Sequence, residues 1–189
     1  LYHIFALTSN MLVFTKVGGQ NVLITNPRDM AGFVKELSRV RFTFITGVNT
    51  LFNGLLNTPG FDRLDFSSLK VALGGGMAVQ AAVSERWRQV TGRHICQGWG
   101  LTATSPVATA NLPDTLEFNG SIGYPLPSTE ISIRDDDGNA LPAGSVGEIC
   151  VRGPQVMRDY WNRPEETAQV MLPGGWLRTG DIGRMDQRG

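Results

Sequence analysis

The sequence predicts an α/β protein: a parallel sheet with flanking helices, followed by a small distorted β-barrel or sandwich. Two observations predict this fold class. In the first part of the chain, short apolar runs alternate three times with helical segments, which is typical of parallel strands joined by right-handed crossovers. After about residue 115, glycine and proline become frequent and strand patterns are separated by turns. We therefore expect an α/β subdomain over residues 1–115 and a β-barrel subdomain over residues 116–189.

The elements of the first part follow from local sequence patterns. Residues 1 to about 17 are apolar all round and stop at Gly18-Gly19, which indicates a buried helix ended by glycine. Asn26-Pro27 predicts the start of a second helix, with Asn as the N-cap and Pro in the first turn. Two more helices are expected, at residues 51–56 and 79–91. Apolar runs predict strands at residues 21–25, 42–46, 70–73 and 93–96.

The second part has the pattern of a small all-β unit. Residues 131–133 alternate, Asp137-Gly138 is a hairpin-type turn, and residues 147–151 return as a strand. Pro164 begins a short helix, and residues 176–179 form a further strand.

Composition excludes several classes of protein. Apolar residues make up 41% and charged residues 18% of 189 residues, which is typical of a folded protein. The formal net charge is zero, so nothing indicates nucleic acid or an anionic membrane as a partner. No apolar run approaches the ~18 residues of a membrane span. Cys96 and Cys150 are expected to be buried free thiols in a reducing compartment.

Three short motifs carry the parts that hold a nucleotide. Gly74-Gly75-Gly76 supplies flexible backbone, the run from Gln97 to Thr102 supplies an aromatic ring and a hydroxyl, and Thr179-Gly180-Asp181 supplies a carboxylate. We expect the first two at the carboxyl ends of parallel strands, where such sheets bind ligands. Trp99 is expected beyond a strand end, where its ring face is presented. Ala103 follows Thr102.

Each motif alone also has a simpler interpretation. The three glycines could form only a tight turn, and Trp99 could belong to the core. Thr102 and Asp181 could cap a helix and a turn. The run Asp135-Asp136-Asp137-Gly138 lacks the alternating spacing of a calcium loop, so a solvated hairpin tip is expected there.

The order and spacing of the motifs distinguish these interpretations. The chain resembles the AMP-forming acyl-CoA synthetase (adenylate-forming) superfamily, and two segments near its start are most similar to bacterial long-chain fatty acid–CoA ligases. The resemblance covers essentially the whole chain. It rests on the segments at residues 1–7, 44–52, 97–102, 120–127, 147–154, 160–161 and 175–181.

The resemblance implies a fold, an activity and a site. Such enzymes activate a carboxylic acid with ATP to acyl-AMP and then transfer the acyl group to coenzyme A. By position, Trp99 stacks on adenine, Thr102 binds the α-phosphate as the catalytic residue, and Asp181 binds the ribose hydroxyls. The implied nucleotide-binding set is Gly74, Gly75, Gly76, Gln97, Gly98, Trp99, Gly100, Thr102 and Asp181. The implied acyl-pocket set is His3, Val48 and Thr50.

The resemblance also shows departures and missing parts. In the family an acid after the threonine helps to hold Mg²⁺, and Ala103 can hold no metal. Leu1 is not an initiator Met and the chain stops after a turn, so we expect an internal fragment of a large N-terminal domain. The phosphate loop and the C-terminal lid with its catalytic lysine are expected outside the chain. The fragment alone is therefore predicted to be inactive.

Two alternatives to a long-chain fatty acid–CoA ligase remain. One is a catalytically impaired paralogue that still binds nucleotide and acyl group, which Ala103 supports. The other is an adenylation domain for another carboxylic acid, although a peptide-synthetase domain would need an acid near the start of the chain. For the full-length protein the resemblance implies a cytoplasmic location, with peripheral association at the inner face of the membrane and homodimerisation left open.

Overall fold

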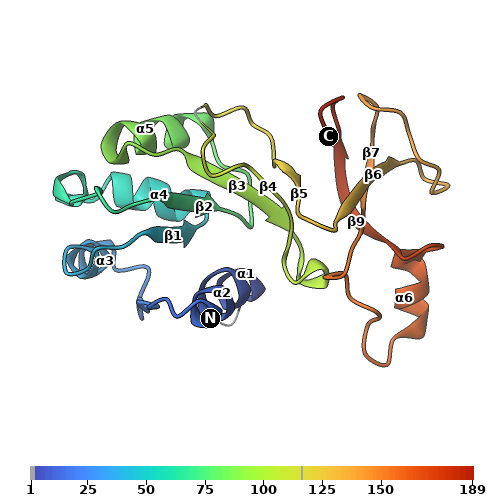
Figure 1. The fold of residues 1–189 in the computed structure, drawn as a ribbon, viewed down its shortest axis with the longest axis horizontal. Coiled ribbons are helices and arrows are strands. Elements are labelled where there is room, and N and C mark those ends of the chain that lie inside the picture. The colour runs from blue at the N-terminus through green and yellow to red at the C-terminus, as the bar shows by residue number, and fades with distance from the viewer. Residues whose placement is uncertain (1–2, 116) are drawn as a thin grey trace. The chain divides into compact units, whose positions relative to one another are not determined.

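The structure is a computed structural model that describes residues 3–115 and 117–189. Its chain forms two compact units, Leu1–Trp99 with Ala110–Gly123, and Gly100–Thr109 with Tyr124–Gly189. Figure 1 shows the elements of both units along the chain. The predicted boundary after residue 115 stays a prediction. None of the helices in the described ranges is long and apolar enough to cross a membrane.

A parallel sheet forms the centre of the first unit, as the sequence predicts. Strands β1 (Phe44–Gly47), β2 (Val71–Gly74) and β3 (Ile95–Gly100) run parallel. Gly47, Gly74 and Gln97 lie in register across the three strands near their carboxyl ends. Strand β4 is Val107–Ala110 and strand β5 is Tyr124–Pro125. The register brings the first two predicted motifs to one edge of the parallel strands.

The helices of this unit supply its core. They are α3 (Met30–Leu37), α4 (Asn49–Leu56), the short 3₁₀ helix η2 (Phe61–Arg63) and α5 (Ala81–Thr91). Trp87 is fully buried, with its ring centroid 4.8 Å from that of Phe52 and 5.3 Å from that of Phe61. Helix α5 ends at Gly92, whose φ of 74° is the left-handed conformation that glycine adopts without strain. The predicted helices at 51–56 and 79–91 are confirmed within a few residues.

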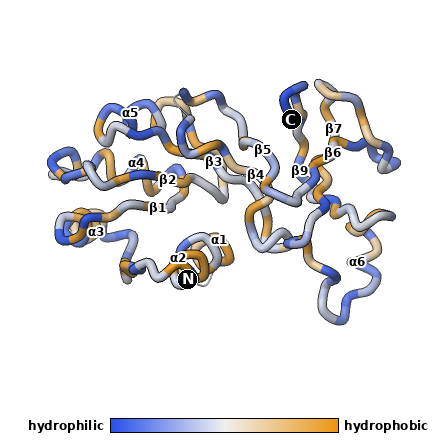
Figure 2. Tube along the Cα trace, viewed as in Figure 1, coloured by the Kyte–Doolittle hydropathy of each residue, from blue (hydrophilic) through white to orange (hydrophobic). Residues whose placement is uncertain are grey.

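The first helical segment differs from the prediction. It consists of α1 (Ile4–Ala6), the π-helix η1 (Leu7–Leu12) and α2 (Val13–Lys16). The prediction that this helical segment is buried is wrong. Only Ser9 is buried in its three elements, and Leu12 is 51% exposed. Figure 2 shows the apolar character of this segment along the chain. An apolar pattern all round a helix predicts burial only where packing partners surround it.

Two further expectations near the N-terminus are wrong. Residues 21–25 form no strand, and Val22 and Leu23 are 45% and 62% exposed. Helix α3 begins at Met30 rather than after Asn26, because Asp29 accepts the Gly32 N–H at 2.9 Å and serves as the N-cap. An apolar run does not by itself distinguish a strand from an extended surface segment.

The second unit is built on a curled antiparallel sheet. Its order is β6-β7-β9-β8, and the predicted helix at Pro164 is confirmed with Pro at its start. The hairpin turn at Asp137-Gly138 is confirmed, with Gly138 at φ 83°. The remaining short element is the 3₁₀ helix η3. The bounds are β6 Glu130–Arg134, β7 Val146–Arg152, α6 Pro164–Val170, β8 Met171–Leu172, β9 Trp176–Arg184 and η3 Thr102–Thr104.

Two predicted strands are longer than expected, and this changes where the motifs lie. The strand predicted at 93–96 is β3 (Ile95–Gly100), so Trp99 lies within the strand rather than beyond its end. The strand predicted at 176–179 is β9, which continues through Asp181. Glycines inside both motifs masked these continuations in the sequence, because glycine usually weakens a strand pattern.

Candidate functional site

The glycine turn begins where β2 ends, and two of its glycines are required by the protein itself. A Cβ on Gly74 would lie 2.6 Å from a methyl of Val79, so only glycine fits against that neighbour. Gly76 has a φ of 78°, which favours glycine. A Cβ on Gly75 would lie 3.1 Å from the Phe5 ring, which brings helix α1 to the turn. The turn is thus a tight, close-packed segment with exposed backbone at Gly76.

Gln97 holds the segment that follows the glycine turn. Its side chain is buried at 4% exposure, and its Oε1 accepts the Val79 N–H at 3.0 Å. Its Nε2 donates to the Ser121 carbonyl at 3.1 Å. Both polar groups of the amide are therefore used within the protein. We infer that Gln97, predicted among the nucleotide-binding residues, acts by fixing the turn.

Asn49 also bonds to the segment that follows the glycine turn, and no sequence motif predicts this role. It is 7% exposed, and its Oδ1 accepts the Gln80 N–H at 2.9 Å. Asn49 is the first residue of α4 and directly follows Val48. A Cβ on Gly76 would lie 3.5 Å from a Val48 methyl, so the predicted acyl-pocket residue Val48 lies beside the turn.

The other two predicted acyl-pocket residues lie near helix starts. Thr50 is exposed in the first turn of α4. His3 is the N-cap of α1, and its Nδ1 accepts the Phe5 N–H at 3.2 Å. The side chain of His3 therefore orders the start of the helix whose Phe5 reaches Gly75. The structure brings Val48 and the His3–Phe5 segment to the glycine turn.

Gly98, Trp99 and Gly100 lie within β3, with partly buried side chains or backbone. The carbonyl of Gly98 would lie 3.3 Å from a Cβ on Gly75, so the two motifs are adjacent. A Cβ on Gly100 would collide with the backbone of Pro106, which explains that glycine by close approach. Trp99 thus lies between Gly98 and Gly100, and close packing explains Gly100.

Thr102 opens the short helix η3 and has an exposed side chain. It is not the helix cap, because Leu101 occupies that position. The anchor of this turn is Thr104, which is fully buried, accepts the Leu101 N–H at 2.8 Å and donates to the Pro106 carbonyl. The sequence does not predict this role of Thr104. The Thr102 hydroxyl makes no hydrogen bond to any described residue.

Ala103 lies in the same turn, and its carbonyl accepts the Met157 N–H at 2.8 Å. A methyl group can coordinate no metal. Among residues 3–115 and 117–189, no group of three or more His, Cys, Asp or Glu side chains could hold a metal ion. The side chains of the described residues therefore do not fit a Mg²⁺ ion that is held without further ligands.

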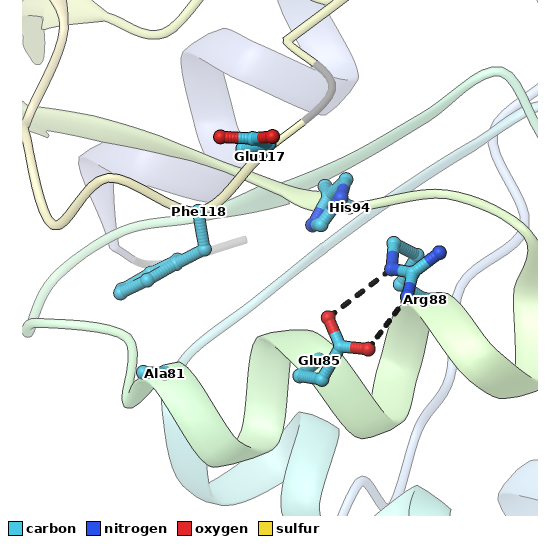
Figure 3. Close-up of a pocket in the computed structure, with 6 residues that line it drawn as sticks. All are labelled: Ala81, Glu85, Arg88, His94, Glu117 and Phe118. Atoms are coloured by element: carbon cyan, nitrogen blue, oxygen red, sulfur yellow. Dashed lines mark hydrogen bonds and ion pairs between the residues drawn. The ribbon is translucent and has the colours of Figure 1, made fainter.

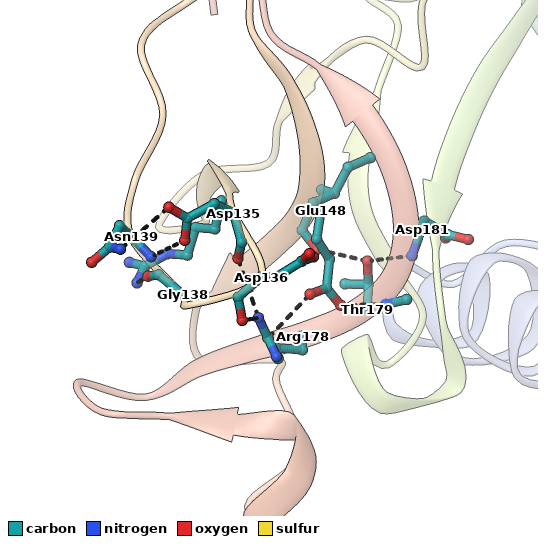
Figure 4. A network of polar contacts seen from close by, with 11 residues as sticks. Asp135, Asp136, Gly138, Asn139, Glu148, Arg178, Thr179 and Asp181 are labelled. Carbon is teal, nitrogen blue, oxygen red and sulfur yellow. Dashed lines mark hydrogen bonds and ion pairs between the residues drawn. The ribbon is translucent and has the colours of Figure 1, made fainter.

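Asp181 lies in β9 of the second unit, in the network drawn in Figure 4. Its N–H donates to the Thr179 hydroxyl at 3.2 Å, and that hydroxyl donates to the Ile149 carbonyl at 2.6 Å. Gly180 has a φ of 75°, and its N–H donates to Glu148 Oε1 at 2.9 Å. Asp181 is exposed and lies within β9.

A surface pocket of about 530 Å³ lies beside α5, and Figure 3 shows its side chains. Glu85 and Arg88 form an exposed ion pair there with a distance of 2.6 Å. Hydrogen bonding to the Arg88 guanidinium holds the pKa of the Glu85 carboxyl below its usual value. The pocket is lined by Ala81, Glu85, Arg88, His94, Glu117 and Phe118. None of the predicted site residues lines it.

The two cysteines flank the candidate segments and are buried, as predicted. Cys96 precedes Gln97 in β3, and Cys150 lies in β7. Burial raises the pKa of both thiols, so the neutral thiol is favoured at both positions. They are core side chains rather than reactive nucleophiles.

The parallel strands, with glycine-rich segments near their carboxyl ends, place the chain in the class of α/β proteins that bind ligands at that edge. Residues 1–161 match the AMP-binding enzyme family, and the chain belongs to this family. The predicted adenylate-forming fold is thereby confirmed.

Individual relatives agree with the family. The chain is 58% identical to a long-chain-fatty-acid–CoA ligase of Yersinia pestis over 189 residues, all of this chain and 34% of that protein. The chain thus spans about a third of the length of the curated relatives it matches.

Solved structures show the same fold. The anthranilate CoA ligase AuaEII in complex with anthranoyl-AMP has a TM-score of 0.89 and 29% identity, over 98% of this chain and 36% of that one. ATP-bound MatB from Rhodopseudomonas palustris has a TM-score of 0.86 and 28% identity, over 100% of this chain and 37% of that one.

Proposed function

We propose that the full-length protein is a long-chain fatty acid–CoA ligase that forms AMP. The single observation that supports this most is the 58% identity to a long-chain-fatty-acid–CoA ligase over the whole of this chain. In the first half-reaction a carboxylate oxygen of the fatty acid attacks the α-phosphorus of ATP, and pyrophosphate leaves. In the second, the coenzyme A thiolate attacks the acyl carbonyl, the thioester forms and AMP leaves.

The described residues have distinct roles in this proposal. The glycine turn allows adenine to approach the backbone without a side chain in the way. Trp99 stacks on adenine, which contributes roughly 1–3 kcal/mol for such rings. The Thr102 hydroxyl donates to an oxygen of the α-phosphate, where charge develops during attack, and Asp181 accepts hydrogen bonds from the ribose hydroxyls.

The remaining residues act on the acyl chain and on the turn. Val48 lies beside Gly76, so it forms the wall where the acyl carboxyl end meets the nucleotide. Gln97 and Asn49 fix the backbone between the two substrates. The proposal includes His3 and Thr50 at the acyl pocket and a cytoplasmic enzyme that meets its substrate at the inner membrane face. In this proposal the full-length protein uses coenzyme A as co-substrate and Mg²⁺ as cofactor, and it forms a homodimer.

Exchange of labelled pyrophosphate into ATP by the full-length protein tests the first half-reaction. We expect exchange that depends on palmitate and is much weaker with benzoate or malonate. Exchange with an aromatic or short acid but not with palmitate would show that the substrate is not a long-chain fatty acid. The absence of exchange with every acid, together with tight AMP binding, would identify a noncatalytic nucleotide-binding paralogue.

Ala103 supplies a second arm of the same experiment. A carboxylate at this position adds an oxygen ligand of the kind that Mg²⁺ prefers. We expect Ala103→Glu in the full-length protein to raise pyrophosphate exchange and to lower the Mg²⁺ concentration at half-maximal rate. The matched control is Ala103→Gln, which adds the same length without charge. If Glu adds nothing to an already fast exchange, the proposed effect of Ala103 is wrong.

A further inference from the structure

The Gly180 peptide is held by a carboxylate from a different strand. Glu148 lies on β7, 32 residues earlier, and its Oε1 accepts the Gly180 N–H at 2.9 Å. The Glu148 side chain is only 17% exposed. A hydrogen bond from a backbone N–H to a carboxylate is charge-assisted and stronger than a neutral one. It therefore fixes a left-handed glycine directly before Asp181.

Glu148 is itself held in place by Arg178. The Arg178 Nε lies 3.1 Å from Glu148 Oε2, and the Arg178 side chain is 25% exposed. Because this Nε has no well-aligned hydrogen-bond acceptor among the described residues, the contact is an ion pair rather than a directed hydrogen bond. The carboxylate is thus restrained at both oxygens, one on Gly180 and one on Arg178.

Arg178 is anchored in turn to the hairpin tip between β6 and β7. Its Nη2 donates to the carbonyls of Asp135 at 3.2 Å and Asp136 at 2.7 Å. The tip is closed by Asp135, whose carboxylate accepts the Asn139 N–H at 2.8 Å. That hydrogen bond holds the pKa of the Asp135 carboxyl below its usual value. Figure 4 shows this chain of contacts running from the tip to Asp181.

Thr179 restrains the next peptide in the same segment. Its hydroxyl donates to the Ile149 carbonyl and accepts the Asp181 N–H. The N–H groups of Gly180 and Asp181 are therefore both bonded to side chains. With both peptides restrained, the direction in which the Asp181 side chain leaves the strand is fixed before any ligand binds.

We propose that Glu148, held by Arg178, is a positioning residue that fixes Asp181 for the ribose hydroxyls of the nucleotide. This inference rests on the proposed role of Asp181. Glu148 contacts the backbone of the segment and acts only through it. Removal of its carboxylate frees the Gly180 peptide, and the carboxylate of Asp181 then loses its preorganised geometry.

The test compares three variants of the full-length protein. Glu148→Ala removes both contacts. Glu148→Gln keeps an oxygen that can accept the Gly180 N–H and loses the charge. The matched control is Glu130→Ala on the neighbouring strand β6, because Glu130 also pairs with an arginine, Arg152, at 2.6 Å but does not contact the Gly180 segment. Thermal unfolding verifies that each variant is folded, and Glu148→Gln replaces Glu148→Ala if the latter is not.

The readouts are the dissociation constants of AMP, 2′-deoxy-AMP and palmitate. We expect Glu148→Ala to weaken AMP about tenfold, a change of ~1.4 kcal/mol, and to reduce the preference for AMP over 2′-deoxy-AMP. Glu148→Gln is expected to fall between Glu148→Ala and the wild type. Palmitate affinity should stay unchanged in all variants, and Glu130→Ala should match the wild type throughout. An unchanged AMP affinity and an unchanged ribose preference in folded Glu148→Ala would overturn the inference.

Asp181→Ala separates this inference from the proposed function. If Asp181→Ala leaves AMP affinity unchanged, the ribose role of Asp181 is wrong, and the inference falls with it. If Asp181→Ala weakens AMP and Glu148→Ala does not, only the positioning role is wrong. Amide hydrogen exchange over residues 176–184 gives an independent readout, and faster exchange is expected in Glu148→Ala but not in Glu130→Ala. In the Asp181→Ala background, adding Glu148→Ala should cause no further loss of AMP affinity.

Discussion

The region of the glycine turn in the first unit and the Thr179–Asp181 segment in the second are both held by side chains, but these side chains differ in charge. Both contain a glycine in the left-handed conformation, Gly76 at φ 78° and Gly180 at φ 75°. In the first unit the N–H groups of Val79 and Gln80, which follow the turn, donate to side chains from β3 and α4. In the second unit the Gly180 N–H donates to a side chain from β7. The first uses the neutral amides of Gln97 and Asn49, and the second uses the carboxylate of Glu148.

The difference follows from burial. Gln97 and Asn49 are 4% and 7% exposed, whereas the Glu148 and Arg178 side chains are 17% and 25% exposed. A charge taken fully out of water carries a large desolvation cost, so a neutral amide suits the buried turn. A partly exposed carboxylate with an arginine partner keeps some solvation and gives a stronger bond to the backbone. The comparison predicts different responses to substitution in the two regions.

The largest effect is expected at Gln97. Gln97→Leu leaves the buried Val79 N–H without its acceptor, whereas the exposed Ser121 carbonyl keeps Asn111 Nδ2 as a donor at 3.0 Å. Because one unsatisfied buried group costs about 1–3 kcal/mol, we expect the free energy of unfolding in urea to fall by about 1–3 kcal/mol. The matched control is Gln89→Leu on the exposed face of α5, which should change it little. A loss below about 1 kcal/mol at Gln97 would mean that the amide does not hold the turn.

A smaller effect is expected at Asn49. Asn49→Ala removes one hydrogen bond, the one to the Gln80 N–H. The free energy of unfolding should fall by about 1–2 kcal/mol. Asn53→Ala in the same helix is the control, because Asn53 is exposed and bonds only to Asn57 through its side chain. Equal losses in the two variants would show that helix propensity rather than the bond to Gln80 determines the result.

The effect on stability should be smaller still at Glu148. Glu148→Gln retains an acceptor for the Gly180 N–H and loses a partly exposed ion pair, and such pairs contribute about 0–1 kcal/mol. We expect a change within that range that shrinks further in high salt. A loss as large as that of Gln97→Leu would contradict the contrast between the buried and the partly exposed region.

The reactivity of the two cysteines, one in each unit, is a further property in which the two units can be compared. Burial raises the pKa of Cys96 in the first unit and of Cys150 in the second, so the reactive thiolate is scarcer at both than in the unfolded chain. We expect neither to react with iodoacetamide at neutral pH in the folded protein, and both to react in urea. Since a raised pKa delays ionisation, any reaction in the folded state should grow as the pH rises. Mass spectrometry of the labelled peptides identifies each site.

The sequence predicts the elements better than it predicts the contacts. Strand–helix alternation, Gly92 after α5 and Pro164 at the start of α6 are read correctly because they are local signals. The bonds that hold the candidate segments join residues separated by 18 positions for Gln97, 31 for Asn49 and 32 for Glu148. Their partners are backbone N–H groups, which leave no residue-type signal in one sequence.

The errors also have physical causes. Residues 21–25 have the apolar pattern of a strand and form none among the described residues. Trp99 was expected beyond a strand because glycine is uncommon within strands, yet β3 continues through Gly98 and Gly100. Close approach by Pro106 explains Gly100, and that neighbour is invisible until the chain is folded.

The central claim is that Asp181 binds the ribose hydroxyls of the nucleotide. Titration of the full-length Asp181→Ala variant with AMP and, separately, with palmitate tests it most directly. A carboxylate that accepts ribose hydroxyls makes charge-assisted bonds, each worth roughly 1.5–3 kcal/mol. We therefore predict that AMP affinity falls at least about tenfold while palmitate affinity stays at the wild-type value. Unchanged AMP affinity, or an equal loss for both ligands, would contradict the claim.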